Sequence, residues 1–216
     1  SAALQILIGK GPPLPMIPSE MVTAGEDQDG EASLIRETVA SLVAFERHCD
    51  LAAHLSTTRS AGTAWSGAPA AWYREPLALF ERLAALAADC SLPTRQHLSF
   101  DEGLIVQRPL LWRLFATVQL AYELDEARRL LSAPNPIGAL ACILWQNRLW
   151  ANVPPLLDAL AGARRIVVAG AGALPLTTLR IAARLDAQIV ALDHDPLAAD
   201  LGRQVMQLKR RGTPLE

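Results

Sequence analysis

The sequence has 216 residues, of which 51% are hydrophobic, enough for one sizeable core or for a core plus a smaller helical unit. Its 20 Lys and Arg stand against 22 Asp and Glu, so no strong net field favours a nucleic acid or an anionic membrane, and a small-molecule partner is expected. Three widely spaced cysteines, Cys49, Cys90 and Cys142, form no CxxC pair, which predicts neither a disulfide framework nor a zinc site and fits a reducing cytoplasm.

The first segment, residues 1–31, is predicted to be an extended or partly disordered arm. Prolines recur from Pro12 to Pro18, and an acidic, glycine-bearing stretch follows from Gly25 to Glu31. Ser1–Ile17 lacks the basic start and uninterrupted apolar core of a secretory signal, and no run of about 18 apolar residues occurs in the sequence. We therefore expect a cytoplasmic protein without a membrane span.

Helices are predicted for most of residues 32–163. Ala32–Leu55 has a helical pattern, whereas Ser56–Ala71 is rich in Ser, Thr, Gly and Ala and is predicted to be a loop. A new helix is expected to begin near Glu75, because apolar residues recur at helical spacing over Pro76–Cys90. These segments are expected to pack into an all-helical domain.

A second amphipathic helix is predicted over Leu110–Leu131. The stretch Ala133–Pro136 ends it, because proline supplies no amide donor and restricts the residue before it. Another helical stretch is expected over Ile137–Leu160, with an interruption at Pro154-Pro155. The helical domain is then expected to end near residue 163.

From residue 164 to residue 216 the pattern changes to alternating strands and helices. Strands are predicted over Ile166–Ala169 and Gln188–Leu192, and helices over Leu174–Leu185 and Leu197–Arg210. This order predicts parallel strands joined by right-handed crossovers, so the segment is expected to be doubly wound α/β. Because a stable parallel sheet needs more than two strands, we expect further strands beyond this sequence.

A glycine turn between the first strand and its helix is the candidate ligand site. Gly170 and Gly172 let a ligand approach the backbone closely, and the start of the helix offers unpaired amides. Asp193 follows the second strand at the same edge of the sheet, where a carboxylate can bind ribose hydroxyls. Pro175 takes the place of the third glycine in a pyrophosphate-binding Gly-x-Gly-x-x-Gly turn, so S-adenosylmethionine (SAM) is favoured over a nicotinamide cofactor.

Two motifs resemble those of a known family. The run Gly-Ala-Gly-Ala-Leu-Pro-Leu-Thr over Gly170–Thr177 and the run Asp-His-Asp-Pro over Asp193–Pro196 are similar to the corresponding runs of the nicotianamine synthases. The resemblance covers roughly Glu75–Leu208. It implies an N-terminal all-helical cap domain followed by a class I SAM-methyltransferase-like Rossmann domain, whose further strands and adenine pocket lie beyond Glu216.

The resemblance also implies an unusual use of SAM as a substrate. Nicotianamine synthases, and their relatives that make opine-type metallophores, direct an amine at the γ-carbon of the methionine arm, transfer 3-amino-3-carboxypropyl and release methylthioadenosine. The similar azetidine-2-carboxylate synthases instead let the α-amine of SAM attack its own γ-carbon. The position of the attacking nitrogen decides the product, because displacement requires in-line approach. Cyclisation and intermolecular transfer both remain open here.

The acceptor side departs from the family pattern. Family enzymes carry acidic residues on the second amphipathic helix, where this sequence has Gln119, Glu123 and Glu126 on one helical face. A glutamine cannot act as a base, so Gln119 serves a separate amino-acid acceptor poorly. The family's tyrosine-rich stretch corresponds to Leu144–Trp150 here, in which Trp145 can hold a sulfonium by cation–π attraction.

The predicted site therefore has a SAM-binding set and a catalytic set. The predicted SAM-binding residues are Gly170, Ala171, Gly172, Pro175, Thr177, Asp193 and His194, and the candidate catalytic residues are Glu123, Gln119 and Trp145. The structural alternatives are a surface ion pair for Glu123 or Glu126, core packing for Trp145 or Trp150, and an N-cap for Asp195, which precedes Pro196.

Two rival functions share the same nucleotide motif. One is an ordinary small-molecule methyltransferase, which yields S-adenosylhomocysteine, and the other is a SAM-binding protein without activity. A metal site is not expected, because His48, Cys49 and His54 have no fourth ligand beside them and the two histidines do not share a helical face.

Overall fold

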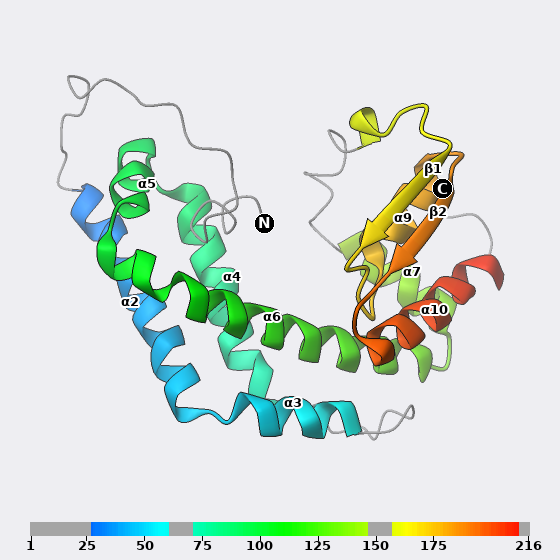
Figure 1. Ribbon diagram of the computed structural model, residues 1–216, viewed down its shortest axis with the longest axis horizontal. Coiled ribbons are helices and arrows are strands. Elements are labelled where there is room, and N and C mark those ends of the chain that lie inside the picture. Colours follow the sequence, from blue (N-terminus) through cyan, green and yellow to red (C-terminus); the bar gives the residue numbers. More distant parts are fainter. Residues whose placement is uncertain (1–26, 61–70, 147–156, 212–216) are drawn as a thin grey trace. The chain divides into compact units, whose positions relative to one another are not determined.

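A computed structural model describes residues 27–60, 71–146 and 157–211. Contacts divide the chain into two compact units, a first unit of residues 1–54 and 71–119 and a second unit of residues 55–70 and 120–216. The elements labelled in Figure 1, with the short η2, are α2 (Asp27–His48), α3 (Leu51–Ser60), η2 (Ala71–Tyr73), α4 (Arg74–Asp89), α5 (Leu92–Ser99), α6 (Glu102–Leu131), α7 (Pro136–Gln146), β1 (Arg165–Ala169), α9 (Leu176–Arg184), β2 (Gln188–Leu192) and α10 (Pro196–Arg211).

The first unit is helical. Within it, α2 packs against α4 and α5, and each helix buries one apolar stripe, as helical spacing dictates. The rings of Phe80 on α4 and Phe115 on α6 meet edge to face, with centroids 5.1 Å apart. The helix expected near Glu75 is confirmed as α4. Fully buried core positions include Ile35, Leu42, Leu83, Leu98 and Leu114.

Helix α6 begins at Glu102 instead of Leu110, so the predicted start was wrong and the predicted end at Leu131 is confirmed. The early start has a local cause, because the Leu104 amide donates to the Asp101 carboxylate over 3.1 Å. Pro109 lies inside the helix and is exposed, so water can satisfy the carbonyl that a proline leaves without a donor.

The predicted loop over residues 56–71 was wrong for its first five positions, because α3 continues to Ser60. Thr58 is buried, and the Arg128 guanidinium donates to the carbonyls of Thr58 and Arg59 in the last turn of α3. Carbonyls at a helix end need such partners, so a tertiary contact extends the helix beyond what the local composition predicts.

After Leu131 the chain breaks where the prolines predict, and α7 then runs over Pro136–Gln146. The Asn135 side chain accepts from the Gly138 amide over 3.0 Å, which caps the start of α7. Trp150 and Pro154-Pro155 lie outside the described residues, and so do residues 147–156 of the predicted helical stretch.

The second unit joins helices to a small sheet. Its buried cluster combines residues of α6 and α7 with residues of the glycine turn, α9 and α10. The unit that holds the glycine turn therefore also contains residues that precede residue 164, from α6 and α7. The predicted domain boundaries themselves stay a prediction. The members of the cluster are Leu124, Ala127, Leu130, Leu140, Ala173, Leu174, Leu176, Leu179, Ala198, Leu201 and Val205.

Strands β1 and β2 pair in parallel, with Arg165 opposite Gln188 and Ala169 opposite Leu192, and α9 packs against β2 (Figure 1). The predicted strand–helix–strand–helix order is confirmed, and the mixed α/β class is what the structure shows. Within the described residues the sheet has two strands, so a larger Rossmann sheet stays a prediction. Val167 and Leu192 remain 57% and 52% exposed.

None of the described helices combines the length and the apolar character needed to cross a lipid bilayer.

Candidate functional site

The glycine turn between β1 and α9 requires glycine at two positions. Gly170 and Gly172 have φ angles of 71° and 75°, in the left-handed region that side chains other than glycine rarely adopt. Between them, the Ala171 amide donates to the Leu192 carbonyl over 3.0 Å, which fixes the turn to the end of β2. The two predicted glycines therefore have a conformational reason to be there.

Asp193 connects the end of β2 to this turn and to α10. One carboxylate oxygen accepts from the Gly172 amide over 2.8 Å, and the other accepts from the Asp195 amide over 2.9 Å. A carboxylate offers about four acceptor positions, and these two bonds occupy two of them. The His194 ring nitrogen lies 3.5 Å from Oδ1 of Asp193 as well. Asp193 thus has a structural role and also lines the cavity described next.

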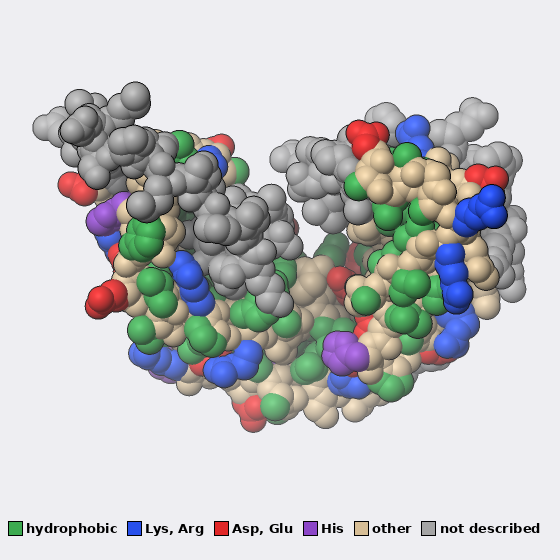
Figure 2. Space-filling model, turned by 45° about the horizontal axis from the view of Figure 1, so that its top comes forward, with side chains coloured by type: hydrophobic (Ala, Val, Ile, Leu, Met, Phe, Trp, Pro, Cys, Tyr) green, Lys and Arg blue, Asp and Glu red, His purple; other side chains and the backbone are tan. Residues whose placement is uncertain are grey.

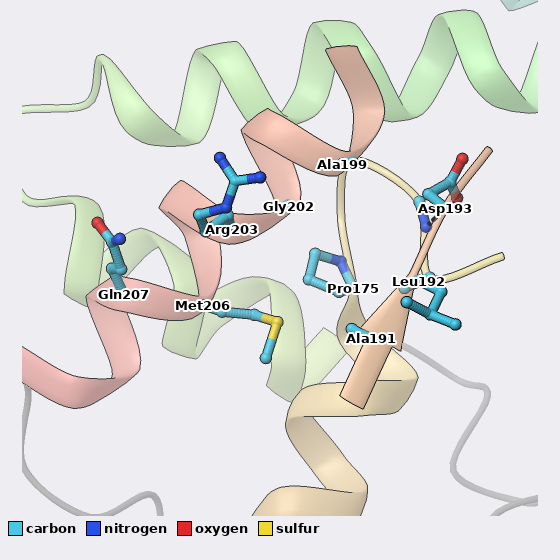
Figure 3. Close-up of a pocket in the computed structure, with 11 residues that line it drawn as sticks. Pro175, Ala191, Leu192, Asp193, Ala199, Gly202, Arg203, Met206 and Gln207 are labelled. Atoms are coloured by element: carbon cyan, nitrogen blue, oxygen red, sulfur yellow. Dashed lines mark hydrogen bonds between the residues drawn. The ribbon is translucent and has the colours of Figure 1, made fainter. Parts of the chain in front are cut away.

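A cavity of about 340 Å³ opens beside Asp193, within the usual range of about 300–1,000 Å³ for small-molecule sites. Figure 3 shows its wall along α10, where Met206 extends toward the side that carries Pro175 and Ala191. The lining residues are Ala171, Gly172 and Pro175 of the turn, Ala191, Leu192 and Asp193 at the end of β2, and Ala199, Gly202, Arg203, Met206 and Gln207 of α10.

Helix α10 rests directly on the glycine turn. A Cβ placed on Gly202 would lie 2.6 Å from the carbonyl oxygen of Gly172, closer than a carbon and a backbone oxygen can approach. Gly202 is buried, so its missing side chain is what allows this contact. The wall of the cavity, formed by α10, and its floor, formed by the glycine turn, are therefore packed against each other through backbone atoms.

Glu123 reaches the same turn from α6. Its carboxylate carbon lies 3.0 Å from the position that a Cβ on Gly172 would occupy, and one of its oxygens is closer still. Glu123 is half-buried, and Gln119 lies one helical turn earlier on the same face of α6. Gly172 therefore contacts two acids, Asp193 through its amide and Glu123 at its α-carbon.

The structural alternatives hold for two other acids. Glu126 forms the predicted ion pair, with Arg129 one turn away on α6, although its own side chain is only 15% exposed. Asp195 caps α10 as predicted, since its Oδ1 accepts from the amides of Leu197 and Ala198, both over 3.0 Å.

The second carboxylate oxygen of Asp195 pairs with the guanidinium of Arg59 on α3. Burial alone raises the pKa of Asp195, but the hydrogen bond from the Ala198 amide and the charge of Arg59 outweigh it, so the pKa lies below its ordinary value. The ionised form of this buried carboxylate is therefore the stable one.

Not every predicted site residue lies in the cavity. Ala171, Gly172, Pro175 and Asp193 line it, whereas Gly170, Thr177, Glu123 and Gln119 do not. His194 also lies outside the lining and its side chain is 95% exposed. The side chain of Trp145 lies outside the described residues, so its predicted role stays a prediction.

Sequence reasoning missed the residues that α10 contributes. Gly202 inside an amphipathic helix was the available signal, because a lone glycine in such a pattern often marks a close backbone approach. Arg203, Met206 and Gln207 lie within about one turn and a half of Gly202 on the same helix, so they are the side chains to expect beside such an approach. The ion pair of Arg59 with Asp195 gave no signal, because its partners are far apart in the chain.

Among the described residues, both basic and acidic side chains occur on the face that Figure 2 shows. Among the described residues there is no group of three or more His, Cys, Asp or Glu side chains placed to hold a metal ion. The lining of the cavity combines the glycine turn, the end of β2 with Asp193, and a face of α10 that carries Arg203 and Gln207.

One comparison with known proteins gives a short match. Over 43 residues, 20% of the chain, the sequence is 44% identical to an L-histidine 2-aminobutanoyltransferase of Yersinia pestis, and this stretch spans 16% of that protein. No family model matches the chain, and no solved structure matches it. The similarity is to a transferase and is confined to a small part of both proteins.

Proposed function

We propose that this chain binds SAM at the glycine turn and takes part in the transfer of its 3-amino-3-carboxypropyl group to an amine, with release of methylthioadenosine. The observation that carries the proposal is the meeting of Asp193 and Glu123 at Gly172. Asp193 is suited to ribose hydroxyls, and Glu123 is suited to an ammonium or amine group. Support also comes from the family resemblance and from the transferase match.

The position of both acids beside Gly172 fits the shape of SAM. The 5′-carbon of the ribose carries the sulfonium, and the reacting γ-carbon of the methionine arm is attached directly to that sulfur. An acid that touches the same glycine as the ribose ligand is therefore near the reacting carbon. In this arrangement Glu123 orients the attacking amine and accepts its proton, and Gly172 leaves room for both.

Apart from the attacking amine, the reaction consumes only SAM. The nitrogen lone pair forms a bond with the γ-carbon while the bond between that carbon and sulfur breaks. The bonding electrons return to sulfur, so the sulfonium becomes the neutral thioether of methylthioadenosine. The new ammonium then loses a proton to a base, for which Glu123 is the candidate. The protein contributes mainly in-line positioning and exclusion of water.

The nitrogen can come from a separate amine or from SAM itself. The name of the relative, an L-histidine 2-aminobutanoyltransferase, describes transfer of a 2-aminobutanoyl group to L-histidine, and this favours a separate amine. Cyclisation of SAM to azetidine-2-carboxylate is the second candidate. It is favoured by Gln119, because a glutamine stands one turn from Glu123 where the resemblance implies another acid.

The test is a product analysis of the purified full-length protein. SAM is supplied alone and then with L-histidine, and products are identified by mass spectrometry. Methylthioadenosine that forms only with the added amine supports transfer, and methylthioadenosine from SAM alone, together with azetidine-2-carboxylate, supports cyclisation. S-adenosylhomocysteine as the product would refute the proposal in favour of a methyltransferase. Binding of SAM without turnover would favour a non-catalytic binding protein.

A further inference from the structure

The last turn of α3 is held at two points in the second unit. Arg128, which is 3% exposed on α6, donates to the carbonyl of Thr58 and, over 3.2 Å, to that of Arg59. The guanidinium of Arg59 then pairs with the carboxylate of Asp195, whose side chain is 5% exposed. A buried arginine therefore fixes the backbone from which Arg59 extends, and this limits where Arg59 can place its charge.

Asp195 transmits this contact to the cavity in two directions. Through its side chain it caps α10, the helix that supplies Ala199, Gly202 and Arg203 to the wall. Through its amide it donates to Asp193, whose other oxygen binds the amide of Gly172. The ion pair is thus located where α10 begins and where the carboxylate of Asp193 is held.

The contact of α10 with the turn makes small movements of this helix consequential. Gly202 already lies against the carbonyl of Gly172, so α10 cannot approach the turn more closely. If the N-terminus of α10 shifts, either the cavity widens or the glycine turn moves with it, because closely packed backbone atoms cannot be compressed further. The position of α10 therefore sets the shape of the cavity.

We propose that Arg59 is a positioning residue for the ligand cavity: its ion pair with Asp195 holds α10 and the Asp193 carboxylate in the arrangement that binds SAM. The proposal rests on the proposed function in that SAM is taken as the ligand. Arg59 itself does not line the cavity and acts through Asp195. A residue of α3 therefore determines affinity at a site built around the glycine turn.

Two charge-removing variants and one conservative variant test this proposal. Arg59→Gln removes the cation, Asp195→Asn removes the anion but keeps a good N-cap, and Arg59→Lys keeps the charge. The control is Arg129→Gln, which breaks an ion pair of α6 that does not touch the cavity. SAM affinity is measured by calorimetry on the full-length protein, and amide hydrogen exchange of the unliganded protein is followed at peptides that cover Gly172 and the start of α10.

Arg59→Gln and Asp195→Asn are each expected to weaken SAM binding about five- to tenfold, at the lower end of typical coupling between sites. The double variant should be no weaker than either single variant, because both remove one interaction. Arg59→Lys should recover most of the affinity, and Arg129→Gln should bind like the wild type. Losses that multiply in the double variant would overturn the proposal, as would wild-type affinity in a folded Arg59→Gln protein.

Hydrogen exchange separates failure of this inference from failure of the proposed function. If the wild type binds no SAM but Arg59→Gln exchanges faster at Gly172 and at the start of α10, the proposed function fails and the structural linkage stands. If the wild type binds SAM and the variants change neither affinity nor exchange, the linkage fails and the proposed function stands.

Discussion

Replacing Gly202 with alanine tests whether α10 rests directly on the glycine turn. In an exposed helix interior this change stabilises a protein, because alanine is favoured over glycine by about 1 kcal/mol. At Gly202 the added Cβ would lie 2.6 Å from the carbonyl oxygen of Gly172, a backbone atom that cannot rotate away. Overpacking of this kind costs about 1–3 kcal/mol. The two effects have opposite signs, so the measurement is decisive.

We expect Gly202→Ala to lower the free energy of unfolding by about 1 kcal/mol, the difference between these two effects. SAM affinity should fall as well, since the change displaces the wall of the cavity from its floor. The free energy is measured by urea unfolding followed by circular dichroism, and affinity by calorimetry. Both quantities are compared with those of the wild type under the same conditions.

Gly30→Ala is the matched control. Gly30 is also a helical glycine, in α2, but a Cβ there would meet no atom within 4 Å. This variant should be neutral or up to about 1 kcal/mol more stable, and its SAM affinity should be unchanged. If Gly202→Ala were as stable as Gly30→Ala and bound SAM like the wild type, the packing of α10 on the turn would be refuted.

Three further predictions concern the acids of the second unit. Asp193→Ala should weaken SAM binding by about 1–3 kcal/mol in calorimetry, because charge-assisted hydrogen bonds are lost, and unchanged affinity would show that Asp193 does not bind the ribose. Glu123→Gln should keep most SAM affinity but slow methylthioadenosine formation about a hundredfold in single-turnover assays, with Glu126→Gln as a control that stays near wild type. Because the pKa of folded Asp195 lies below the ordinary 3.8, its charge stabilises the fold above that pH, and this contribution disappears as the pH falls through the lower folded value. Asp195→Asn should therefore flatten the fall in unfolding free energy on acidification, and an unchanged slope would contradict the assignment.

The parts of the fold that depend on neighbouring residues were predictable from the sequence. Strand β2 was placed at its observed bounds, since Gln188–Leu192 is a short apolar run between turn residues. The two glycines and Asp193 each follow a strand, so their meeting at one edge follows from the parallel direction of the two strands. Helix ends were less predictable where a distant side chain decides them, as Arg128 does for α3.

The candidate site was predictable only on its own segment. Glu123 was chosen for its place on a helical face, but its contact with Gly172 depends on how α6 packs in the second unit, which no local pattern contains. Gly202, Met206 and the Arg59 ion pair are likewise products of tertiary packing. Local chemistry thus identified the floor of the cavity, and tertiary structure supplied its wall.

The ion pair between α3 and α10 also sets an order on folding during synthesis. Arg59 and Asp195 are 136 positions apart in the chain, a stretch that a ribosome needs about 7 to 27 seconds to translate. Until Asp195 has been synthesised, Arg59 at the end of α3 lacks its ion-pair partner. The residues of the first unit, which end at position 119, have by then all been synthesised. Substitutions in the last turn of α3 should therefore reduce the yield of folded protein in cells even where the finished molecule tolerates them.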